Sequence, residues 1–355
     1  MLEEISKKLI LFPTVAGNKE AFQACFSYIQ ALVAETDLLV RTYEFEGEMS
    51  LLITNQDTLD LDILFCGHID VVEAKSSLFQ PHIKQGRLYG RGAFDMKGHD
   101  AVMIACMKQL PPHKKIGLLL TSDEERGGFQ GTNRLVNEVG LKTKVAIVPD
   151  AGNDFALVTQ EKGVLQIELT AHGKSAHASK PYEGNNAIDQ LLQVYQSLLR
   201  QYPLPKDDTM FQTSINLSKI TGGDAINKVP ETATLILDIR HIPSDTKEQL
   251  LSTIQKENPT VEIKILACGD AFEVDPTHPY LKQYQTCCEQ VLNRPIHQTT
   301  CESSSDGRFF TAHHIPCILM NATGHDLHGP NEYVEIESLE KLYQIYQKFI
   351  KSSIL

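Results

Sequence analysis

The sequence predicts an α/β domain with a mostly parallel central sheet, into which a second, α+β domain is inserted. Strands and helices alternate up to about residue 163, which is typical of a parallel sheet with crossover helices. The order then changes to β-α-β-β-α-β, as in a ferredoxin-like sandwich, and the first pattern returns near residue 272. We therefore predict a discontinuous first domain, residues 1–163 and 272–355, and an inserted domain, residues 164–271.

Length and composition limit the classes of function. The 355 residues are enough for two domains with substantial cores, and the formal net charge is −12 without a basic stripe. No apolar run approaches the roughly 20 residues of a membrane span, and the N-terminus does not resemble a signal peptide. The eight cysteines are scattered without a CxxC pair. We expect a cytoplasmic protein with reduced thiols that binds neither nucleic acid nor membranes.

The first part of the chain contains apolar strands separated by amphipathic helices. Helical spacing predicts helices at 2–12, 20–34, from about 98, and at 131–138. Short apolar runs predict strands at 51–54, 62–66, 116–121 and 145–150. Several of these strands run directly into polar residues, and ligand sites on parallel sheets lie at the carboxyl ends of the strands.

The inserted domain and the last part of the chain follow the same logic. Alternation predicts strands at 165–172, 211–220, 232–241 and 261–267, with helices at 184–200 and 245–256. After residue 275 we predict a helix at 278–292, a strand at 316–320 and a closing helix from about 336. These elements complete the discontinuous first domain.

The strand ends carry side chains that bind metal ions. The segment LLLTSDEERGG (118–128) ends a strand in acids, and side chains alternate along an extended backbone, so Glu124 and Glu125 should point different ways. Further candidates are two histidines and three aspartates, namely His68, Asp70, Asp95, Asp150 and His328. Histidine and carboxylate are the ligands of hydrolytic zinc, cobalt or manganese sites.

This set is sufficient for two metal ions. Two ions need one bridging carboxylate, for which we choose Asp95. His68 and Asp150 then serve one ion, and Glu125 and His328 serve the other. Asp70 lies two residues after His68 and is placed to orient its ring. Glu124 remains as the general base.

Each residue also has an ordinary structural explanation. His68 fits a core histidine and Asp70 a turn acid; Asp95 fits a helix cap, and the Glu pair and Asp150 fit solvated loop acids. His325 competes with His328, which we prefer because Asn-Glu-Tyr follows it. We assign structural or surface roles to His99 and to the pair His313 and His314, and in the inserted domain His172 is a weak rival of His177.

The ordered motifs resemble a known family. H-x-D, GRG-x-x-D-M-K-G, D-E-E, Asp150 and H-x-x-N-E-Y follow the pattern of the dinuclear-zinc acetylornithine deacetylase / succinyl-diaminopimelate desuccinylase / carboxypeptidase G family. The resemblance covers nearly the whole chain. It implies a zinc-peptidase-like catalytic domain, two divalent ions (zinc, or else cobalt or manganese), an inserted lid or dimerisation domain, and a cis peptide between Asp95 and Met96.

The resemblance adds residues of the inserted domain. It implies that His177, in GKSAHAS, stabilises the oxyanion, and that in dimeric relatives this histidine comes from the partner subunit. It makes Asn227 and Arg240 candidates for binding the substrate carboxylate, although Arg240 in a strand also suits a simple ion pair with Asp238. The SSSDGRF stretch (303–309) resembles the desuccinylase branch, but Ser-Asp-Gly is also a common turn.

The resemblance implies hydrolysis of a linear amide or peptide bond. The first choice is a deacylase of small N-acyl amino acids, of the acetylornithine or succinyl-diaminopimelate kind. Deacylases of the family mostly have Glu where this chain has Asp150, whereas several peptidase relatives have Asp, so a dipeptidase or carboxypeptidase is the alternative. A catalytically inactive binding protein on the same fold is a third. The chain is either a monomer or a homodimer that pairs through the inserted domain.

Overall fold

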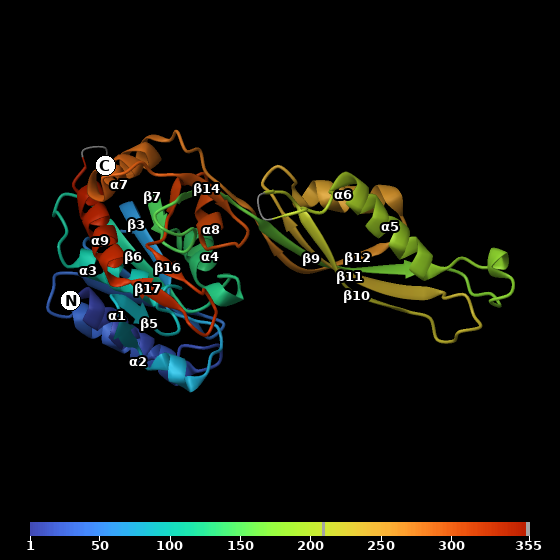
Figure 1. Ribbon diagram of the computed structural model, residues 1–355, viewed down its shortest axis with the longest axis horizontal. Coiled ribbons are helices and arrows are strands. Elements are labelled where there is room, and N and C mark those ends of the chain that lie inside the picture. The colour runs from blue at the N-terminus through green and yellow to red at the C-terminus, as the bar shows by residue number, and fades with distance from the viewer. Residues whose placement is uncertain (208–209, 353–355) are drawn as a thin grey trace. The chain divides into compact units, whose positions relative to one another are not determined.

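The computed structural model describes residues 1–207 and 210–352 of the chain. It consists of two compact units. Unit 1 comprises Met1–Thr159, Val274–Cys301 and Ser305–Leu355, and unit 2 comprises Gln160–Glu273 and Glu302–Ser304. Unit 1 is coloured blue to green and orange to red in Figure 1, and unit 2 is green-yellow to orange.

A mixed sheet with a parallel centre forms the core of unit 1. Its strands are β1 (Leu39–Phe45), β2 (Glu48–Thr54), β3 (Asp60–His68), β6 (Ile116–Thr121), β7 (Lys142–Val148), β8 (Leu157–Glu161), β14 (Gln298–Cys301) and β15 (Cys317–Leu319). The order is β1-β2-β6-β3-β7-β15-β8, with β14 paired to β8. The central neighbours β6, β3, β7 and β15 are parallel, and the outer pairs are antiparallel. Every residue of β6 is buried, and so is every residue of β3 after Asp60, because the sheet is covered on both faces.

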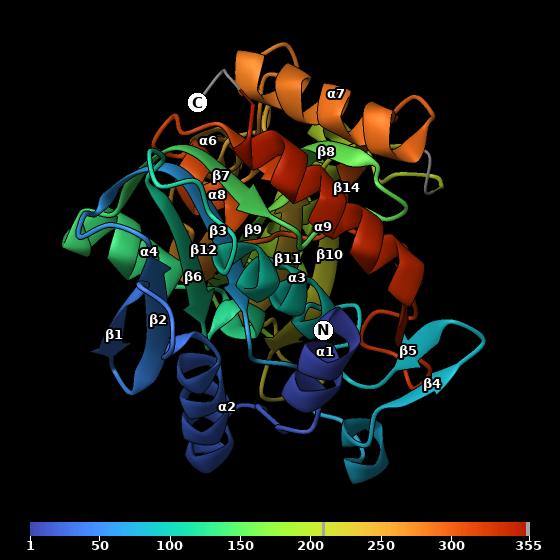
Figure 2. The same cartoon turned by 90° about the vertical axis from the view of Figure 1, so that its left-hand side faces the viewer.

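Helices cover this sheet. They are α1 (Leu2–Ile10), α2 (Lys19–Val33), α3 (Lys97–Met107), α4 (Thr132–Arg134), α7 (Pro279–Leu292), α8 (Gly307–Thr311) and α9 (Ile336–Ile350). Helix α3 contacts α1, α9 and the strands β3 and β6 (Figure 2). Every residue of α3 is therefore buried, whereas its sequence pattern predicts burial of one face only.

A second, small sheet in unit 1 has the order β16-β17-β5-β4. Its strands are β4 (His82–Lys84), β5 (Arg87–Tyr89), β16 (Gly324–His325) and β17 (Tyr333–Glu335). Strand β5 leads into the loop before α3, and β16 and β17 flank residues 326–332. The sheet therefore holds together two segments that are more than 200 residues apart in the sequence, in pairs such as Tyr89 with Tyr333.

Unit 2 has the predicted β-α-β-β-α-β order. It consists of β9 (Gly163–His172), α5 (Ala187–Gln201), β10 (Ser214–Gly222), β11 (Thr232–His241), α6 (Lys247–Glu257) and β12 (Glu262–Gly269). The antiparallel sheet has the order β10-β11-β9-β12. Alternate residues of β9 and β11 are buried against α5 and α6 in a core of their own. Strand β13 (Phe272–Glu273) pairs with the last two residues of β8.

One local expectation is wrong, and another is correct only in part. Glu124 and Glu125 do not continue the strand but form a 3₁₀ turn with Arg126, because Gly127 follows in a left-handed conformation and closes it. The helix expected at 131–138 is regular only over Thr132–Arg134 and then widens into a π-helical turn, Leu135–Val139. Further short 3₁₀ turns occupy Ser76–Phe79 and Pro181–Glu183. None of the helices in residues 1–207 and 210–352 combines the length and the apolar character that a membrane span requires.

Candidate metal centre

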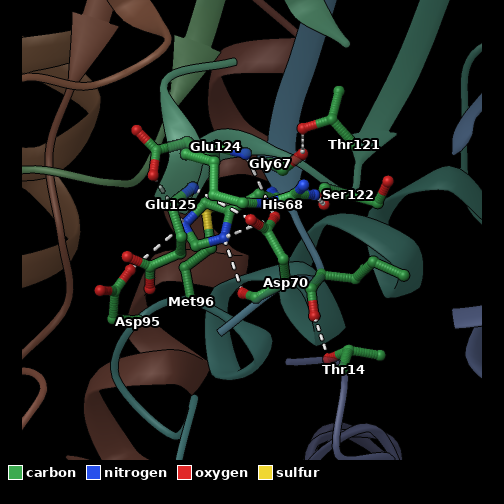
Figure 3. A network of polar contacts seen from close by, with 12 residues as sticks. Thr14, Gly67, His68, Asp70, Asp95, Met96, Thr121, Ser122, Glu124 and Glu125 are labelled. Carbon is green, nitrogen blue, oxygen red and sulfur yellow. Dashed lines mark hydrogen bonds and ion pairs between the residues drawn. The ribbon is translucent and has the colours of Figure 1, made fainter. Parts of the chain in front are cut away.

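The candidate ligands gather at one edge of the central sheet. Strand β3 ends at His68, which is in register with Thr121 at the end of the parallel strand β6. Glu124 follows β6 by three residues, and Asp150 follows β7 by two. Parallel strands end at the same edge, which is why these side chains meet although they are far apart in the sequence. Figure 3 shows His68 facing Asp95, Glu124 and Glu125.

His68, Glu124 and Asp150 form the first group. Their ligand atoms all lie within 4.8 Å of one another. His68 Nε2 is 3.6 Å from Asp150 Oδ1 and 4.0 Å from Glu124 Oε2. The His68 side chain is 1% exposed, so it is withdrawn from bulk water.

Asp95, Glu125 and His328 form the second group, again within 4.8 Å. His328 Nε2 lies 2.9 Å from Asp95 Oδ2 and 3.3 Å from Glu125 Oε1. The other Asp95 oxygen, Oδ1, lies 3.2 Å from His68 Nε2. The Asp95 carboxylate therefore faces both groups, one oxygen to each histidine, as a bridging ligand must.

The loop before α3 presents Asp95 to both groups. The Asp95–Met96 peptide bond is cis, as the resemblance implies. Helix α3 has Met96 at its N-cap and no side-chain cap bond, so Asp95 does not act as the helix cap that its sequence position allowed. Its carboxylate is instead free to face the two histidines.

Asp70 holds this arrangement from behind. His68 Nδ1 lies 3.0 Å from the Asp70 backbone oxygen and 3.5 Å from its Oδ1, opposite the ring nitrogen that faces the ligands. The Asp70 carboxylate also accepts the backbone N–H groups of Glu124 and Glu125, at 3.3 and 3.0 Å. It thus connects the histidine to the acidic turn.

The donor set suits two divalent cations. The two groups contain two histidines and four carboxylates, whose formal charge of −4 matches that of two divalent ions. Burial and the charge of Asp150 raise the pKa of Glu124 well above its usual value. Burial and the nearby Asp95 and Glu125, opposed by His68, raise the pKa of Asp150 to about 7. A cation between these carboxylates would relieve the repulsion and favour their ionised forms.

The two histidines favour ionisation of the shared aspartate. Burial opposes the ionised form of Asp95, but hydrogen bonds from His328 and His68 outweigh burial and lower its pKa. The Asp95 and Glu125 contacts in turn raise the pKa of His328 to about 10. The same carboxylates would also stabilise a bound metal cation, which would replace the proton on the histidine.

The rival histidines lie outside both groups. His325 is in ring contact with Tyr333, at 6.1 Å between centroids. His99 is buried and accepts the Ala322 backbone N–H through Nε2, and His172 pairs with Glu262 at the surface. The buried contact of His99 agrees with the structural role expected for it.

Unit 2 carries His177, Asn227 and Arg240. His177 is exposed, and its Nδ1 contacts both the Ser179 hydroxyl, at 2.8 Å, and the Ser179 backbone N–H, at 3.2 Å. Exposed Asn227 lies next to it, because its carbonyl accepts the Ala178 N–H at 2.9 Å. Strand β11 follows Asn227 in the sequence and begins at Thr232. Arg240 lies eight residues further along this strand, roughly 26 Å from Thr232. It makes two hydrogen bonds to Asp238, at 2.7 and 3.2 Å, the ion pair considered as its alternative role.

The SSSDGRF stretch packs against the acidic turn. Asp306 binds the Thr132 hydroxyl, and Arg308 donates to the Gly127 carbonyl at 2.6 Å. Both side chains are buried, and burial raises the pKa of Asp306. The stretch thus supports the loop that presents Glu124 and Glu125.

Sequence reasoning assigned no role to Arg91 and Glu332. Glu332 is the glutamate of the Asn-Glu-Tyr motif, used only to choose His328, and Arg91 is the arginine of the GRG motif. The two form a buried ion pair behind the Asp95 loop. The signal available in the sequence was their position inside the two motifs that carry Asp95 and His328.

A cavity of about 560 Å³ lies beside the small sheet. Its lining includes His82, Tyr89, His325 and Tyr333 but none of the six candidate ligands. We therefore do not assign the reaction to this cavity.

Comparisons with known proteins agree with this geometry. Residues 64–352 match the family model described as Peptidase family M20/M25/M40. A succinyl-diaminopimelate desuccinylase from Rickettsia bellii is 26% identical over 379 residues, covering 96% of both proteins. One from Helicobacter pylori (strain P12) is 29% identical over 387 residues, covering 97% of this chain and 96% of the relative.

Solved structures share the fold. A tripeptidase from Staphylococcus aureus has a TM-score of 0.76 at 23% identity, with 99% of this chain and 97% of that chain covered. A dinuclear metal-binding peptidase of the M20 family from Bacillus subtilis has a TM-score of 0.73 at 12% identity, with 98% and 96% covered. These comparisons confirm the predicted fold class, a catalytic unit with a parallel central sheet and a separate antiparallel α+β unit.

Proposed function

Because the chain belongs to peptidase family M20/M25/M40 and is a metal-dependent hydrolase, we propose that it cleaves a small N-acyl amino acid with two divalent ions. The observation that carries this proposal is the Asp95 carboxylate, which faces His68 with one oxygen and His328 with the other. His68 and Asp150 would hold one ion, Glu125 and His328 would hold the second, and Asp95 would serve both. Zinc is the first choice of metal, with cobalt and manganese as alternatives.

Glu124 is the general base of the reaction. Bound metal ions would polarise the scissile carbonyl and lower the pKa of water. Glu124 removes a proton from the attacking water and delivers it to the leaving amine. Burial and the charge of Asp150 raise the pKa of Glu124 above its usual value, which favours acceptance of a proton by this carboxylate. Asp70 keeps the backbone of the acidic turn in place and orients His68.

His177 of unit 2 is the proposed oxyanion donor. Its Nδ1 accepts the Ser179 N–H, so its outward Nε2–H is available to a developing negative charge. Asn227 and Arg240 are proposed to bind the substrate carboxylate. For Arg240 this requires release from Asp238, which occupies its guanidinium.

The substrate we favour is an N-acylated diamino acid. The near-full-length relatives named succinyl-diaminopimelate desuccinylase support this choice. The alternative is a dipeptidase or carboxypeptidase, which Asp150 favours because several peptidase relatives have Asp where most deacylases have Glu. A homodimer through unit 2 is proposed as well, since β10 and β12 are the edges of its sheet and expose Ile220 and Ile265.

A hydrolysis panel tests the proposal. Protein reconstituted with zinc, cobalt or manganese is offered N-acetylornithine, N-succinyl-diaminopimelate and a set of dipeptides, and release of free amine is measured. Cleavage of the acylated diamino acids alone supports the deacylase. Cleavage of dipeptides alone overturns that choice in favour of the peptidase, and no cleavage with any metal contradicts both.

A further inference from the structure

Glu332 is a buried carboxylate surrounded by donors from the loop that carries Asp95. Its side chain is fully withdrawn from solvent. Oε2 accepts the Gly92 backbone N–H at 3.1 Å, and Oε1 accepts those of Phe94 and Asp95 at 2.9 and 3.1 Å. The loop therefore wraps around one carboxylate, which holds the backbone of Asp95 directly.

Gly92 allows this wrapping. Its φ is +84°, in the left-handed region, and an added Cβ would lie 3.0 Å from the Val71 and Lys97 side chains. A larger residue would be strained and crowded there, so the loop could not turn its N–H groups onto Glu332 as closely.

Arg91 connects the same carboxylate to the loop that carries His328. One guanidinium nitrogen, Nη1, donates to Glu332 Oε2. The other, Nη2, donates to the backbone oxygens of His328 and Gly329, at 2.6 and 3.3 Å. The planar fork of arginine suits this double contact, which a lysine ammonium does not reproduce.

These contacts close a ring. Asp95 is bound through its N–H to Glu332, Glu332 to Arg91, Arg91 to the His328 carbonyl, and His328 Nε2 to Asp95 Oδ2 at 2.9 Å. We infer that the Arg91–Glu332 pair is a positioning device that sets the spacing of Asp95 and His328 and so selectively supports the Asp95–Glu125–His328 metal position. Within the described part of the chain, His68 and Asp150 form no hydrogen bond or ion pair with Arg91 or Glu332, so the other position depends on the pair only through Asp95. This inference rests on the proposed two-metal function.

The chain contains a matched control pair. Arg87 and Glu335 lie opposite each other on β5 and β17, in the same small sheet. Their side chains are 39% and 37% exposed and 3.3 Å apart. An exposed ion pair of this kind contributes little to the free energy of unfolding. Neither residue forms a hydrogen bond or ion pair with Asp95 or His328 within the described chain.

The test is a metal titration against a competing chromophoric chelator, with Zn²⁺ and Co²⁺, on Glu332→Gln, Arg91→Lys, Glu335→Gln and Arg87→Lys. We expect wild type to bind two ions. Glu332→Gln and Arg91→Lys should weaken one of the two affinities about 10- to 100-fold and leave the other within about threefold. The two control variants should retain both affinities. The double variant of Arg91 and Glu332 should lose little more than the stronger single variant, because the residues act as a unit.

The outcomes separate this inference from the proposed function. If wild type does not bind two ions, the two-metal function itself is wrong. If wild type binds two and both folded variants do as well with unchanged affinities, only the positioning role is overturned. A lower melting temperature with both affinities intact would likewise assign the pair a purely structural role. Should Glu332→Gln fail to fold, Arg91→Lys, which keeps the charge, decides the question.

Discussion

At the level of single residues, Asp95 lies between the two groups of candidate ligands. Its two oxygens face different histidines, 3.2 and 2.9 Å away. The sequence named Asp95 as the bridging carboxylate, and this geometry is compatible with that role. It did not predict Glu332 as a partner of Asp95, since the contacts of Glu332 join residues 237 to 241 positions apart. Only the folded small sheet brings such segments together.

His99, which is not one of the candidate metal ligands, makes a pH-dependent contribution to the free energy of unfolding. It is fully buried, and burial lowers its pKa to about 4. The unfolded chain binds this proton near pH 6.5. The contribution is therefore complete above about pH 6.5 and is lost as the pH falls toward 4.

We expect His99→Gln to flatten the acid branch of the stability curve. Glutamine can still accept the Ala322 N–H but does not titrate. Between pH 7 and 4.5 the unfolding free energy of wild type should fall about 2–3 kcal/mol more than that of the variant. Urea unfolding of the chelator-treated wild type and variant measures the two free energies at each pH. Parallel curves for the two proteins would show that His99 is not buried in its neutral form.

At the level of elements, the sequence predicted the long buried strands but not the strands of two or three residues. Strands β3 and β6 are continuous apolar runs, and the match at Ile116–Thr121 is complete. Strands of two or three residues, such as β5 and β16, have no periodicity of their own and exist only through pairing. The acidic turn was expected to be extended, but Gly127 closes it into a 3₁₀ turn. The two glutamates still face different groups, for a different reason than the one inferred.

Gly128 makes the conformation of this turn testable. Its φ is +62°, and an added Cβ would lie 1.9 Å from Asp306 Oδ1, on a buried side chain held by Thr132. Gly128→Ala should destabilise the protein by at least about 2 kcal/mol and displace Glu124 and Glu125, weakening metal binding.

Gly140→Ala is the matched control. Its φ is +81°, but nothing lies within 4 Å of the added Cβ. It should cost about 1 kcal/mol from backbone strain alone and leave metal affinity unchanged. Urea unfolding and metal titration of both variants measure the difference. Equal losses in the two variants would mean that the Asp306 contact does not hold the acidic turn.

At the level of the whole molecule, all six candidate ligands belong to unit 1, although they come from two of its three chain segments. The family resemblance and the fold class were evident from the order of motifs, and the comparisons confirm both. The predicted boundaries are 163/164 and 271/272; the two compact units divide at 159/160, within β8, and at 273/274, after β13, and residues 302–304 also belong to unit 2. Chain pattern alone does not reveal the pairing of β8 with β13.

The six candidate ligands belong to unit 1 and His177 belongs to unit 2, so substitutions of the two sets should have separable effects. His177→Ala should reduce kcat about 100- to 1,000-fold, as expected for loss of one oxyanion donor, and leave two ions bound. His172→Ala, at an exposed histidine of the same unit, should change neither quantity. Steady-state kinetics and metal analysis of the same preparations are needed. Unchanged turnover in His177→Ala would remove this residue from the reaction.

The most direct test of the whole account is a measurement of the role of Glu124. Glu124 lies in the first ligand group, 4.0 Å from His68 Nε2, so its position alone suits a ligand as well as a base. The measurement is metal content and turnover of Glu124→Gln beside wild type. The account predicts two ions in both proteins and a loss of at least about 100-fold in kcat for the variant. Loss of one ion from the variant, or turnover equal to wild type, would contradict it.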